Sequence, residues 1–387
     1  MIRKKPHIYG VLTVVLLLLS QVQDISAQTS AVPFLLISPN SRNSAMGESG
    51  VAIADDVSAI FWNPAGLGFQ QGMELSLNHS NWLPQFQQSD LYFEYASYKM
   101  DLPSIGGTLG AALTYLSLGK FERRDEGNNR LGEFESYELA FSTSYGARVD
   151  EDLGLGIGLR IIHSSLSQVG TAREQGSGTA TAVAGDVGIL YRPSKLTLPF
   201  SNTDIGNRFA VGASITNIGP SISYIDEAQA DPLPTALRVG FKYDIVKEKY
   251  NILTFTTDIT KLLISRTDRK ADPFYKAVYK SWDVEDVLKT FTLGTGFEYW
   301  YSQLVALRFG FFHEDPNMGN RRFLTFGAGV RYDIYGFDFS YISTAISDDD
   351  VISPLSETLR FTLSVNWGRG SGPADDGTRI PVDDAAN

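Results

Sequence analysis

Residues 358–367 read TLRFTLSVNW, and this stretch decides the fold. Every second residue is apolar, and the residues between them are polar or charged. The apolar positions are Leu359, Phe361, Leu363, Val365 and Trp367. Successive side chains of a β-strand point to opposite faces, so the alternation predicts a strand with one apolar and one polar face.

The same alternation recurs along most of the chain, in about fourteen segments. Most of them are about 10–14 residues long, whereas strands of soluble proteins usually have about 5–6. About 9–11 tilted residues cross a bilayer, which fits the lengths seen here. The approximate spans are 73–80, 90–101, 106–118, 134–148, 153–166, 178–192, 208–217, 235–246, 251–260, 290–301, 303–313, 321–333, 335–345 and 357–368.

An open sheet edge in lipid would leave backbone hydrogen-bonding groups unpaired, so strands that cross a membrane have to close on themselves. We therefore predict an all-β fold, a transmembrane antiparallel β-barrel of about 14 strands over residues 73–368, with long extracellular loops. The alternative is an exported soluble protein, such as a sandwich or a propeller, that buries its apolar faces between sheets.

The lengths of the connections support a barrel. Short connections near residues 102–104, 150–152, 247–249, 301–302 and 334–335 alternate with longer ones. Outer-membrane barrels have short periplasmic turns and long outer loops, so this alternation orients the strands. The connection 193–207 is long where a short turn is expected. It is either a periplasmic insertion or a sign of a miscounted strand.

The N-terminus resembles an export signal. Arg3, Lys4 and Lys5 precede the apolar run YGVLTVVLLLLS at 9–20, and Ser26-Ala27 offers a cleavage site. We expect residues 1–27 to be a secretory signal peptide. The alternative is a transmembrane anchor, but the run is shorter than the ~20 residues that span a bilayer.

Composition excludes several kinds of chemistry. The chain has no cysteine and a formal net charge of −11, which excludes disulfides and thiolate metal sites and argues against nucleic acid as a partner. Beyond the signal peptide, the histidines are the scattered His79, His163 and His313. No catalytic, metal or cofactor set is recognisable, so we expect a protein that is not an enzyme and binds no cofactor.

Residues 28–72 do not alternate, and small residues are frequent among them. A short helix is expected at Asp56–Phe61, ended by the turn Asn63, Pro64, Ala65 and Gly66. Small side chains allow a segment to fold into a confined lumen, so we predict an N-terminal plug. The alternative is a plain linker.

Several stretches resemble a known family. The sequence SRNSAMGESGVAIADDVSAIFWNPAGL at 41–67 resembles the entry motif of the PorV/PorQ family of bacterial outer-membrane proteins, which is distantly similar to FadL-type channels. The resemblance continues through SLGKFERRDEGNNRLGEF at 117–134, ITNIGPSISY at 215–224 and the long string at 296–333. It covers nearly the whole chain beyond the signal peptide.

The resemblance implies a component of the type IX secretion system in the outer membrane of a Gram-negative bacterium. Such a protein contacts outer-membrane lipid and associates with the giant translocon barrel of the system. It binds the C-terminal domains of exported cargo proteins and passes them to a sortase-like attachment complex. Both termini would be periplasmic. The alternative function is a FadL-type channel for the uptake of hydrophobic small molecules.

Charged residues of the expected lumen are the first candidates for a working site. Arginines fall on predicted inward positions, and the plug carries Glu48, Asp55 and Asp56. We hypothesise that lumen arginines hold the plug through these acids, because opposite charges interact more strongly in a narrow lumen than on an open surface. The alternative is ordinary solvated lumen charge. The arginines are Arg160, Arg238, Arg308, Arg331 and Arg360.

Two outer loops are candidates for binding the translocon or cargo. The first loop contains Trp82, Leu83, Pro84 and Phe86. In the loop 261–289, Asp272-Pro273 predicts a helix start, and an aromatic stripe of Phe274, Val278 and Trp282 follows. Exposed aromatic residues favour interfaces, although the stripe could instead pack on the barrel rim. The acidic, Gly- and Pro-rich tail 369–387 is expected to be disordered and periplasmic.

Overall fold

The computed structural model describes residues 30–86, 90–124, 127–167, 178–200, 203–226, 229–268, 270–343 and 355–368. The predicted signal peptide 1–27 and the predicted tail 369–387 lie outside the described residues.

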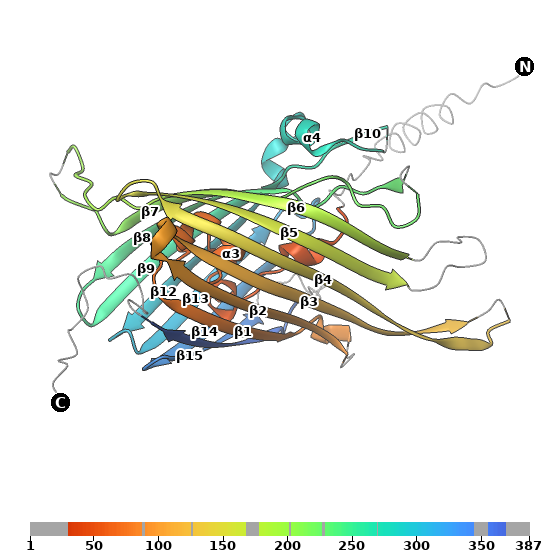
Figure 1. The fold of residues 1–387 in the computed structure, drawn as a ribbon, viewed down its shortest axis with the longest axis horizontal. Helices are drawn as coiled ribbons and strands as arrows, with labels where there is room; N and C mark the ends of the chain where they lie inside the picture. The colour runs from red at the N-terminus through yellow and green to blue at the C-terminus, as the bar shows by residue number, and fades with distance from the viewer. Residues whose placement is uncertain are drawn as a thin grey trace, which may run out of the picture.

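Fourteen antiparallel strands close into a barrel in the order β1-β16-β15-β14-β13-β12-β9-β8-β7-β6-β5-β4-β3-β2 (Figure 1). The last strand pairs with the first, Leu77 opposite Leu363, which removes every sheet edge. The predicted fold class is confirmed. The barrel strands are β1 (Met73–Asn81), β2 (Leu91–Leu102), β3 (Gly107–Arg124), β4 (Arg130–Arg148), β5 (Leu153–Ser167), β6 (Gly178–Tyr191), β7 (Phe209–Ile218), β8 (Ala236–Lys247), β9 (Asn251–Leu262), β12 (Phe291–Tyr301), β13 (Val305–Glu314), β14 (Arg322–Tyr332), β15 (Tyr335–Ser343) and β16 (Leu359–Trp367).

The connections distinguish the two ends of the barrel. At one end, here called the short-turn end, strands are joined by brief turns such as η4 (Pro103–Ile105). The opposite end is called the long-loop end. The connection 192–208 lies at the short-turn end, and in its described part Thr197 forms a β-bridge with Asp204. Because the barrel closes with fourteen strands, this connection is an insertion between β6 and β7, and the strand count holds.

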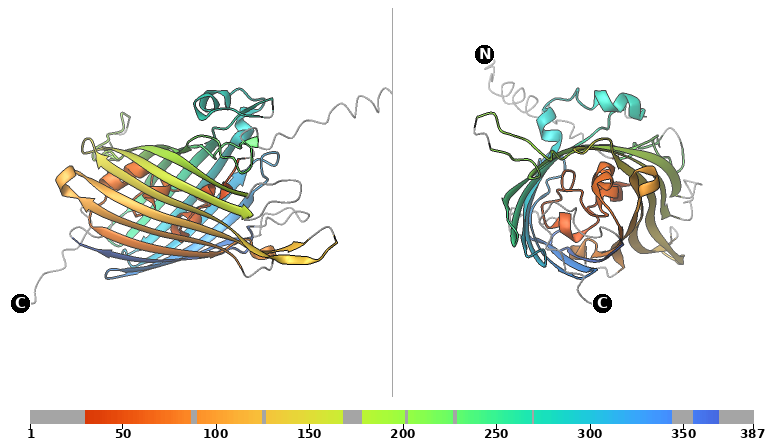
Figure 2. Two further views of the ribbon diagram at one scale, coloured as in Figure 1. Left: turned by 45° about the vertical axis from the view of Figure 1, so that its right-hand side comes forward. Right: turned by 60° about the vertical axis from the view of Figure 1, so that its left-hand side comes forward.

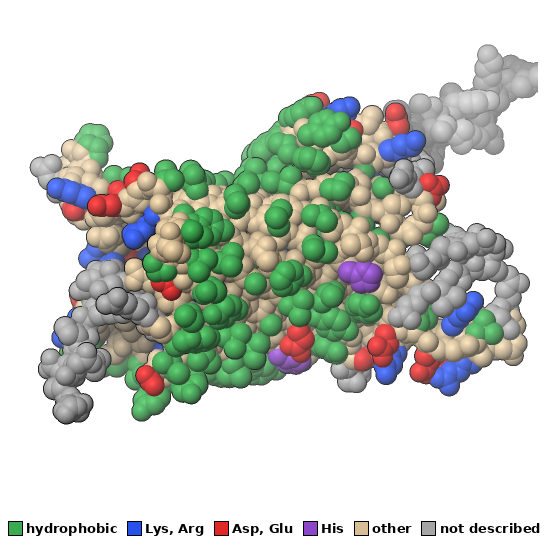
Figure 3. Space-filling model, in the orientation of Figure 1, with side chains coloured by type: hydrophobic (Ala, Val, Ile, Leu, Met, Phe, Trp, Pro, Cys, Tyr) green, Lys and Arg blue, Asp and Glu red, His purple; other side chains and the backbone are tan. Residues whose placement is uncertain are grey.

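The outer wall of the barrel carries an apolar band (Figure 3). On β5, Leu155, Ile157, Leu159 and Ile161 are all exposed on this face. Rings of Tyr92, Tyr115, Tyr137 and His163 follow one another across β2–β5 with centroids 6.0, 5.9 and 6.0 Å apart. Aromatic girdles of this kind flank the lipid-facing band of outer-membrane barrels.

The band has the thickness of a membrane. On β4, Tyr137 near the long-loop end and Tyr145 near the short-turn end face the same side of the strand. At about 3.3 Å per residue and a tilt of about 40°, the distance between them along the barrel axis is ~20 Å. The lipid-facing band of outer-membrane barrels is about 25 Å tall, so the positions of Tyr137 and Tyr145 fit the two membrane surfaces.

Strands β3 and β4 continue past the girdle as a projecting hairpin. The last residues of β3, 119–124, pair with the first residues of β4, 130–136, whereas the next strand, β5, pairs only with residues 137–148 of β4. Phe121 stacks on Phe134 at 5.7 Å on the hairpin surface. Figure 2 shows this hairpin extending beyond the rest of the rim at the long-loop end.

Residues 30–72 fill the interior of the barrel and are called the plug (Figure 2). The plug starts at the long-loop end, where the Ala31 amide donates to the Pro232 carbonyl oxygen at 3.0 Å. It then descends to Met73 at the short-turn end. Its elements are η1 (Pro33–Leu36), α2 (Ser41–Ser44), α3 (Ala59–Trp62) and η2 (Pro64–Phe69).

The prediction that both termini lie at the periplasmic end falls on residues outside the described ranges. The described part of the chain starts at the long-loop end and ends at the short-turn end. The reason is that the plug uses its whole length to run through the lumen before β1 begins. Within the described residues, no helix has the length and apolarity to cross a membrane.

Candidate functional site

Glycines of the wall let the plug backbone lie directly against the barrel. A Cβ placed on Gly156 of β5 would lie 2.2 Å from the Ala65 nitrogen and 2.2 Å from the Pro64 carbonyl carbon. On Gly310 of β13, a Cβ would lie 2.1 Å from the Gly47 nitrogen. These are impossible distances, so only glycine permits this approach. The plug is therefore fitted to this wall, on opposite sides of the lumen.

Asn63 fixes the predicted turn Asn63-Pro64-Ala65-Gly66 to the wall. Its side-chain Nδ2 donates to the Val51 and Ile189 carbonyl oxygens at 3.1 and 3.0 Å, and its Oδ1 accepts from the Ala65 amide at 3.1 Å. Ile189 belongs to β6, so one buried side chain joins two parts of the plug to the barrel. The carbonyl oxygens would lose these partners if the amide were removed.

Replacing Asn63 by Ala is expected to destabilise the plug by about 1–3 kcal/mol, because buried backbone groups lose their partners. In a background in which the other four tryptophans are replaced by Phe, the emission of Trp62, which is buried beside Asn63, reports on this region during thermal unfolding in detergent. The matched control is Asn251→Ala at the short-turn end, where the Asn251 side-chain Oδ1 accepts a 2.7 Å hydrogen bond from the Tyr299 hydroxyl. Equal midpoints for the two variants would contradict the assigned role of Asn63.

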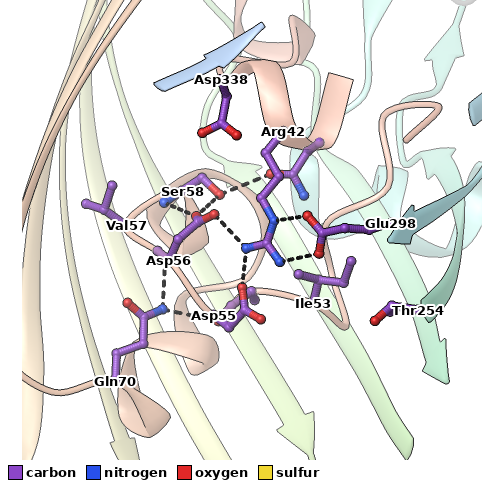
Figure 4. A network of polar contacts seen from close by, with 12 residues as sticks. Arg42, Ile53, Asp55, Asp56, Val57, Ser58, Gln70, Thr254, Glu298 and Asp338 are labelled. Carbon is purple, nitrogen blue, oxygen red and sulfur yellow. Dashed lines mark hydrogen bonds and ion pairs between the residues drawn. The ribbon is translucent and has the colours of Figure 1, made fainter. Parts of the chain in front are cut away.

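Arg42 is the centre of a charge network that joins the plug to the wall (Figure 4). Its guanidinium binds Glu298 of β12 through two parallel hydrogen bonds, Nε to Oε1 and Nη2 to Oε2, both 2.8 Å long. Nη1 also contacts Asp55 Oδ1 at 2.5 Å and Asp56 Oδ2 at 3.0 Å. Bidentate pairs of arginine and carboxylate are strong and geometrically specific. One plug side chain thus holds both the plug's own acids and the barrel.

The network continues along the wall with alternating charge. Arg308 Nε contacts Glu298 Oε1 at 2.8 Å, and its Nη1 contacts Asp338 at 2.7 Å. Arg331 Nη2 contacts the other oxygen of Asp338 at 2.6 Å. Four strands, β12 to β15, therefore contribute to one chain of ion pairs that ends at the plug.

This arrangement changes the hypothesis about the plug acids. We expected lumen arginines to bind Asp55 and Asp56, but both contact Arg42, which belongs to the plug itself. The lumen arginines Arg308 and Arg331 bind wall carboxylates instead. Burial lowers the pKa of Arg42, but the carboxylates of Asp55 and Glu298 outweigh burial and raise it well above its usual value. Arg42 therefore stays charged.

The other predicted lumen arginines have separate partners. Arg160 binds Asp186 at 3.2 Å and Asn217, while Arg238 donates to Thr216 at 2.8 Å and covers the Phe61 ring at 5.3 Å. Arg360 is 2% exposed, and its Nε and Nη1 have no hydrogen-bond partner among the described residues. Burial raises the pKa of Glu48, and Arg360 and Arg321 oppose this rise. No ion pair joins Glu48 to a lumen arginine among the described residues, so the positive charge of Arg360 acts on Glu48 only through space.

A cavity of about 490 Å³ separates the plug from the short-turn end. Charged side chains from both the plug and the wall line it, including Asp55, Asp56, Glu74, Lys99, Lys242 and Asp244. On the other side, the plug residues Phe34 and Leu35 pack in an apolar cluster with Phe93, Leu116 and Ile162 of the wall. The lumen therefore contains a polar cavity near the short-turn end, and apolar side chains of the plug and the wall fill it towards the long-loop end.

The first predicted docking loop folds over the mouth of the barrel. The Trp82 ring lies 6.4 Å from Phe93 and joins the apolar cluster, and Leu83 packs with Phe312, Phe323 and Ile342. Pro84 begins the short turn η3 (Pro84–Phe86) and is half-buried. Phe86 is 57% exposed. Of this group, Phe86 is the side chain that a partner could reach directly.

The second predicted docking loop lies outside the barrel wall (Figures 1 and 2). It contains a small hairpin, β10 (Arg266–Thr267) with β11 (Lys270–Ala271), and the helix α4 (Phe274–Lys280). Ala277 is the buried residue of this helix. Phe274 and Trp282 are exposed, and Val278 is half-buried and accepts a 2.9 Å hydrogen bond from Trp282 Nε1. Phe274 is therefore exposed, whereas the partly exposed Trp282 ring packs against the barrel, 6.0 Å from the Phe291 ring of β12.

No group of three or more His, Asp or Glu residues within the described ranges is placed to hold a metal ion. The plug occupies the lumen, and the ion pair of Arg42 with Glu298 joins it to the wall, while Arg160, Arg308 and Arg331 pair with carboxylates of the wall itself. The sequence did not single out Arg42, Glu298 or Asp338. The sequence shows only that each of these residues is charged and stands at an inward-facing strand position or in the plug. It does not show which of them form ion pairs with each other.

Comparison with solved structures agrees with this architecture. A deletion mutant of the monoaromatic hydrocarbon channel TodX aligns with a TM-score of 0.50 and 13% identity over 85% of this chain and 96% of its own. The Ralstonia pickettii toluene transporter TbuX (TM-score 0.48, 15% identity, 84% and 97% covered) and a Pseudomonas aeruginosa FadL homologue (0.43, 12%, 84% and 97%) are further similar structures. At these identities the likeness concerns the fold alone.

The comparison with curated proteins finds no match. Residues 20–269 match the family described as type IX secretion system protein PorV, and this segment is more than half of the 387 residues. The fourteen-stranded barrel, its lipid-facing band and its plug agree with that match. The chain belongs to the PorV family and is an outer-membrane protein of the type IX secretion system.

Proposed function

We propose that this protein binds the C-terminal domains of secreted cargo at its long-loop end, receives them at the translocon barrel and passes them to the sortase-like attachment complex. It acts without catalysis, and its long-loop end faces the cell exterior. The observation that carries this proposal is the closed lumen. Arg42 and Glu298 bind the plug to the wall, so the surface available to a protein partner lies outside the lumen.

The exposed apolar side chains at the long-loop end support binding there. Phe86 in the first loop and Phe121 and Leu131 on the projecting hairpin are 57%, 46% and 54% exposed. The hairpin also carries ion pairs, including Lys120 with Glu135 at 3.3 Å. A mixture of exposed aromatic and charged groups around a blocked mouth is typical of a protein-binding rim.

The alternative, a channel for hydrophobic small molecules, has less support. Sites for such ligands are lined mainly by apolar side chains. The cavity in this lumen is lined by Asp55, Glu74 and Lys99 among other charged groups, and it lies at the short-turn end. The long-loop side of the plug, where uptake would begin, is filled by Phe34, Phe93 and their neighbours.

The test is direct binding by the purified barrel in detergent. We expect the isolated C-terminal domain of a secreted cargo protein to bind, and laurate not to bind above its level in a plain β-barrel control. In the variant Phe86→Ser/Phe121→Ser, binding of the domain should weaken by about tenfold or more, since central aromatic contacts are each worth ~1–2 kcal/mol or more.

Leu109→Ser, on the lipid-facing wall of β3, is the matched control and should bind the domain normally. Saturable binding of laurate together with no binding of the domain would favour the channel and overturn the proposal. Unchanged binding in the double variant would remove these residues from the binding surface.

A further inference from the structure

The segment 272–288 lies against the outer face of the wall and not over the mouth (Figures 1 and 2). It follows β9 and returns to the barrel through η6 (Val287–Thr290) at the start of β12. Both strands end there at the long-loop end. The segment therefore lies beside the part of the lipid-facing band that is nearest the long-loop end.

Lys261 fastens this segment to the wall. On β9, Ile259 points outward and is 47% exposed, so Lys261, two residues further, points outward as well. Lys261 is nevertheless only 1% exposed, because its Nζ lies 5.2 Å from the Trp282 ring centroid and 5.5 Å from that of Phe291. The Nζ also donates to the Thr290 hydroxyl at 2.6 Å. A cation on the outer wall is thus covered by the segment.

Lys261 and the segment that covers it lie at the height of a membrane surface along the barrel axis. Lys261 pairs with Phe291 across the ladder, and the next outward-facing pair towards the short-turn end is Ile259 with Leu293, both apolar and exposed. The apolar band therefore ends immediately below the segment. Aromatic residues gather at such borders, as the girdle through Tyr115 and Tyr137 does on the other side of the barrel.

The face of the segment that points away from the wall is apolar and aromatic. Figure 3 shows this hydrophobic surface on α4. Lys276 and Lys280 stand on the same short helix, and Lys289 follows shortly after. Aromatic rings beside lysines characterise segments that lie in the headgroup region of a bilayer. The exposed apolar and aromatic residues of the segment are Phe274, Tyr275, Tyr279, Trp282, Val284 and Leu288, and the acidic residues Asp283, Glu285 and Asp286 are exposed beside them.

We propose that residues 272–288 form an interfacial lipid anchor, in which the aromatic face of α4 and Trp282 is immersed at the headgroup border of the membrane. We assign lipid as the partner of this face for two reasons. The face lies outside the barrel wall, and it adjoins the edge of the lipid-facing band. That the leaflet is the outer one rests on the orientation proposed above. The lipid contact itself depends on neither cargo binding nor orientation.

Quenching of tryptophan fluorescence by brominated lipid tests the proposal. The full-length protein is reconstituted in phosphatidylcholine vesicles with or without bromine at acyl carbons 6 and 7, or 11 and 12. The difference between the wild type and Trp282→Phe gives the signal of Trp282. Trp367, half-buried on the outer face at the opposite rim, serves as the outer-face reference through Trp367→Phe, and the plug residue Trp62 is buried at 4% exposure.

We expect the Trp282 signal to be quenched by the shallow bromines to the same extent as the Trp367 signal, and less by the deep bromines. Aqueous iodide should quench Trp282 weakly in vesicles. Strong quenching by iodide with none by bromolipid would show that the face points to water and is free for a protein partner, and this would overturn the proposal. A second measurement uses cargo: Trp282→Ser should bind the cargo domain normally, and a loss of binding would assign the face to cargo instead.

Discussion

Glu298→Ala is expected to release the plug. Glu298 accepts hydrogen bonds from Arg42 and Arg308, and its side chain is 3% exposed, so its removal leaves two buried guanidinium groups without a shared partner. Breaking a buried ion pair by deleting one member costs about 3–5 kcal/mol. In planar bilayers, the variant should show frequent channel openings, whereas the wild type stays closed.

The control is Glu133→Ala. Glu133 pairs with Arg130 on the projecting hairpin, where both side chains are about half exposed. Exposed pairs of this kind contribute about 0–1 kcal/mol, so conductance should stay at the wild-type level. If Glu298→Ala remained as closed as this control, the charge network would not be what holds the plug.

Gly156→Ala is the second change with a large expected effect. Its new methyl group would lie 2.2 Å from backbone atoms of both Pro64 and Ala65, so the plug has to move away from β5. Overpacking of this kind costs about 1–3 kcal/mol or more. A protease added to the short-turn side should then cleave within the plug. The barrel itself should stay folded in detergent that has not been heated, as the wild type does.

Gly185→Ala is the matched control on the neighbouring strand β6. Its added methyl group would meet nothing nearer than the Gly158 carbonyl oxygen at 3.7 Å. Proteolysis of this variant should match the wild type. Equal protection of the plug in the Gly156 and Gly185 variants would contradict the close approach of the plug to the wall.

The barrel strands could be predicted because successive residues of a strand face lipid and lumen in turn. The lipid side requires apolar residues, and the lumen side favours polar ones. Each predicted span contains the observed strand, apart from shifts of a few residues at the ends. The exception is the hairpin beyond residues 118 and 134, where β3 and β4 extend to Arg124 and from Arg130. Both faces of that hairpin meet water, so the alternation of apolar and polar residues stops while the strand pairing continues.

The plug was predictable as a segment, but its contacts were not. Small residues and the Asn63-Pro64 turn indicated a chain that folds into a confined space. Arg42 and Glu298, however, are 256 residues apart in sequence, and they meet only because of where the plug settles in the closed barrel. The same limit applies to Trp82, whose inward direction depends on an apolar cluster made by strands across the mouth.

The absence of cysteine from the sequence allows a single crosslink to test the central claim that cargo transfer needs no movement of the plug. Ser41 of the plug and Thr362 of β16 have hydroxyl oxygens 2.9 Å apart, so we choose Ser41→Cys/Thr362→Cys as the crosslinked variant and check that the disulfide forms by the mobility shift between oxidised and reduced protein. We predict that cells carrying the oxidised variant display cargo on their surface at the same level as cells in which the crosslink is reduced. Loss of display on oxidation, restored by a reductant, would contradict the account.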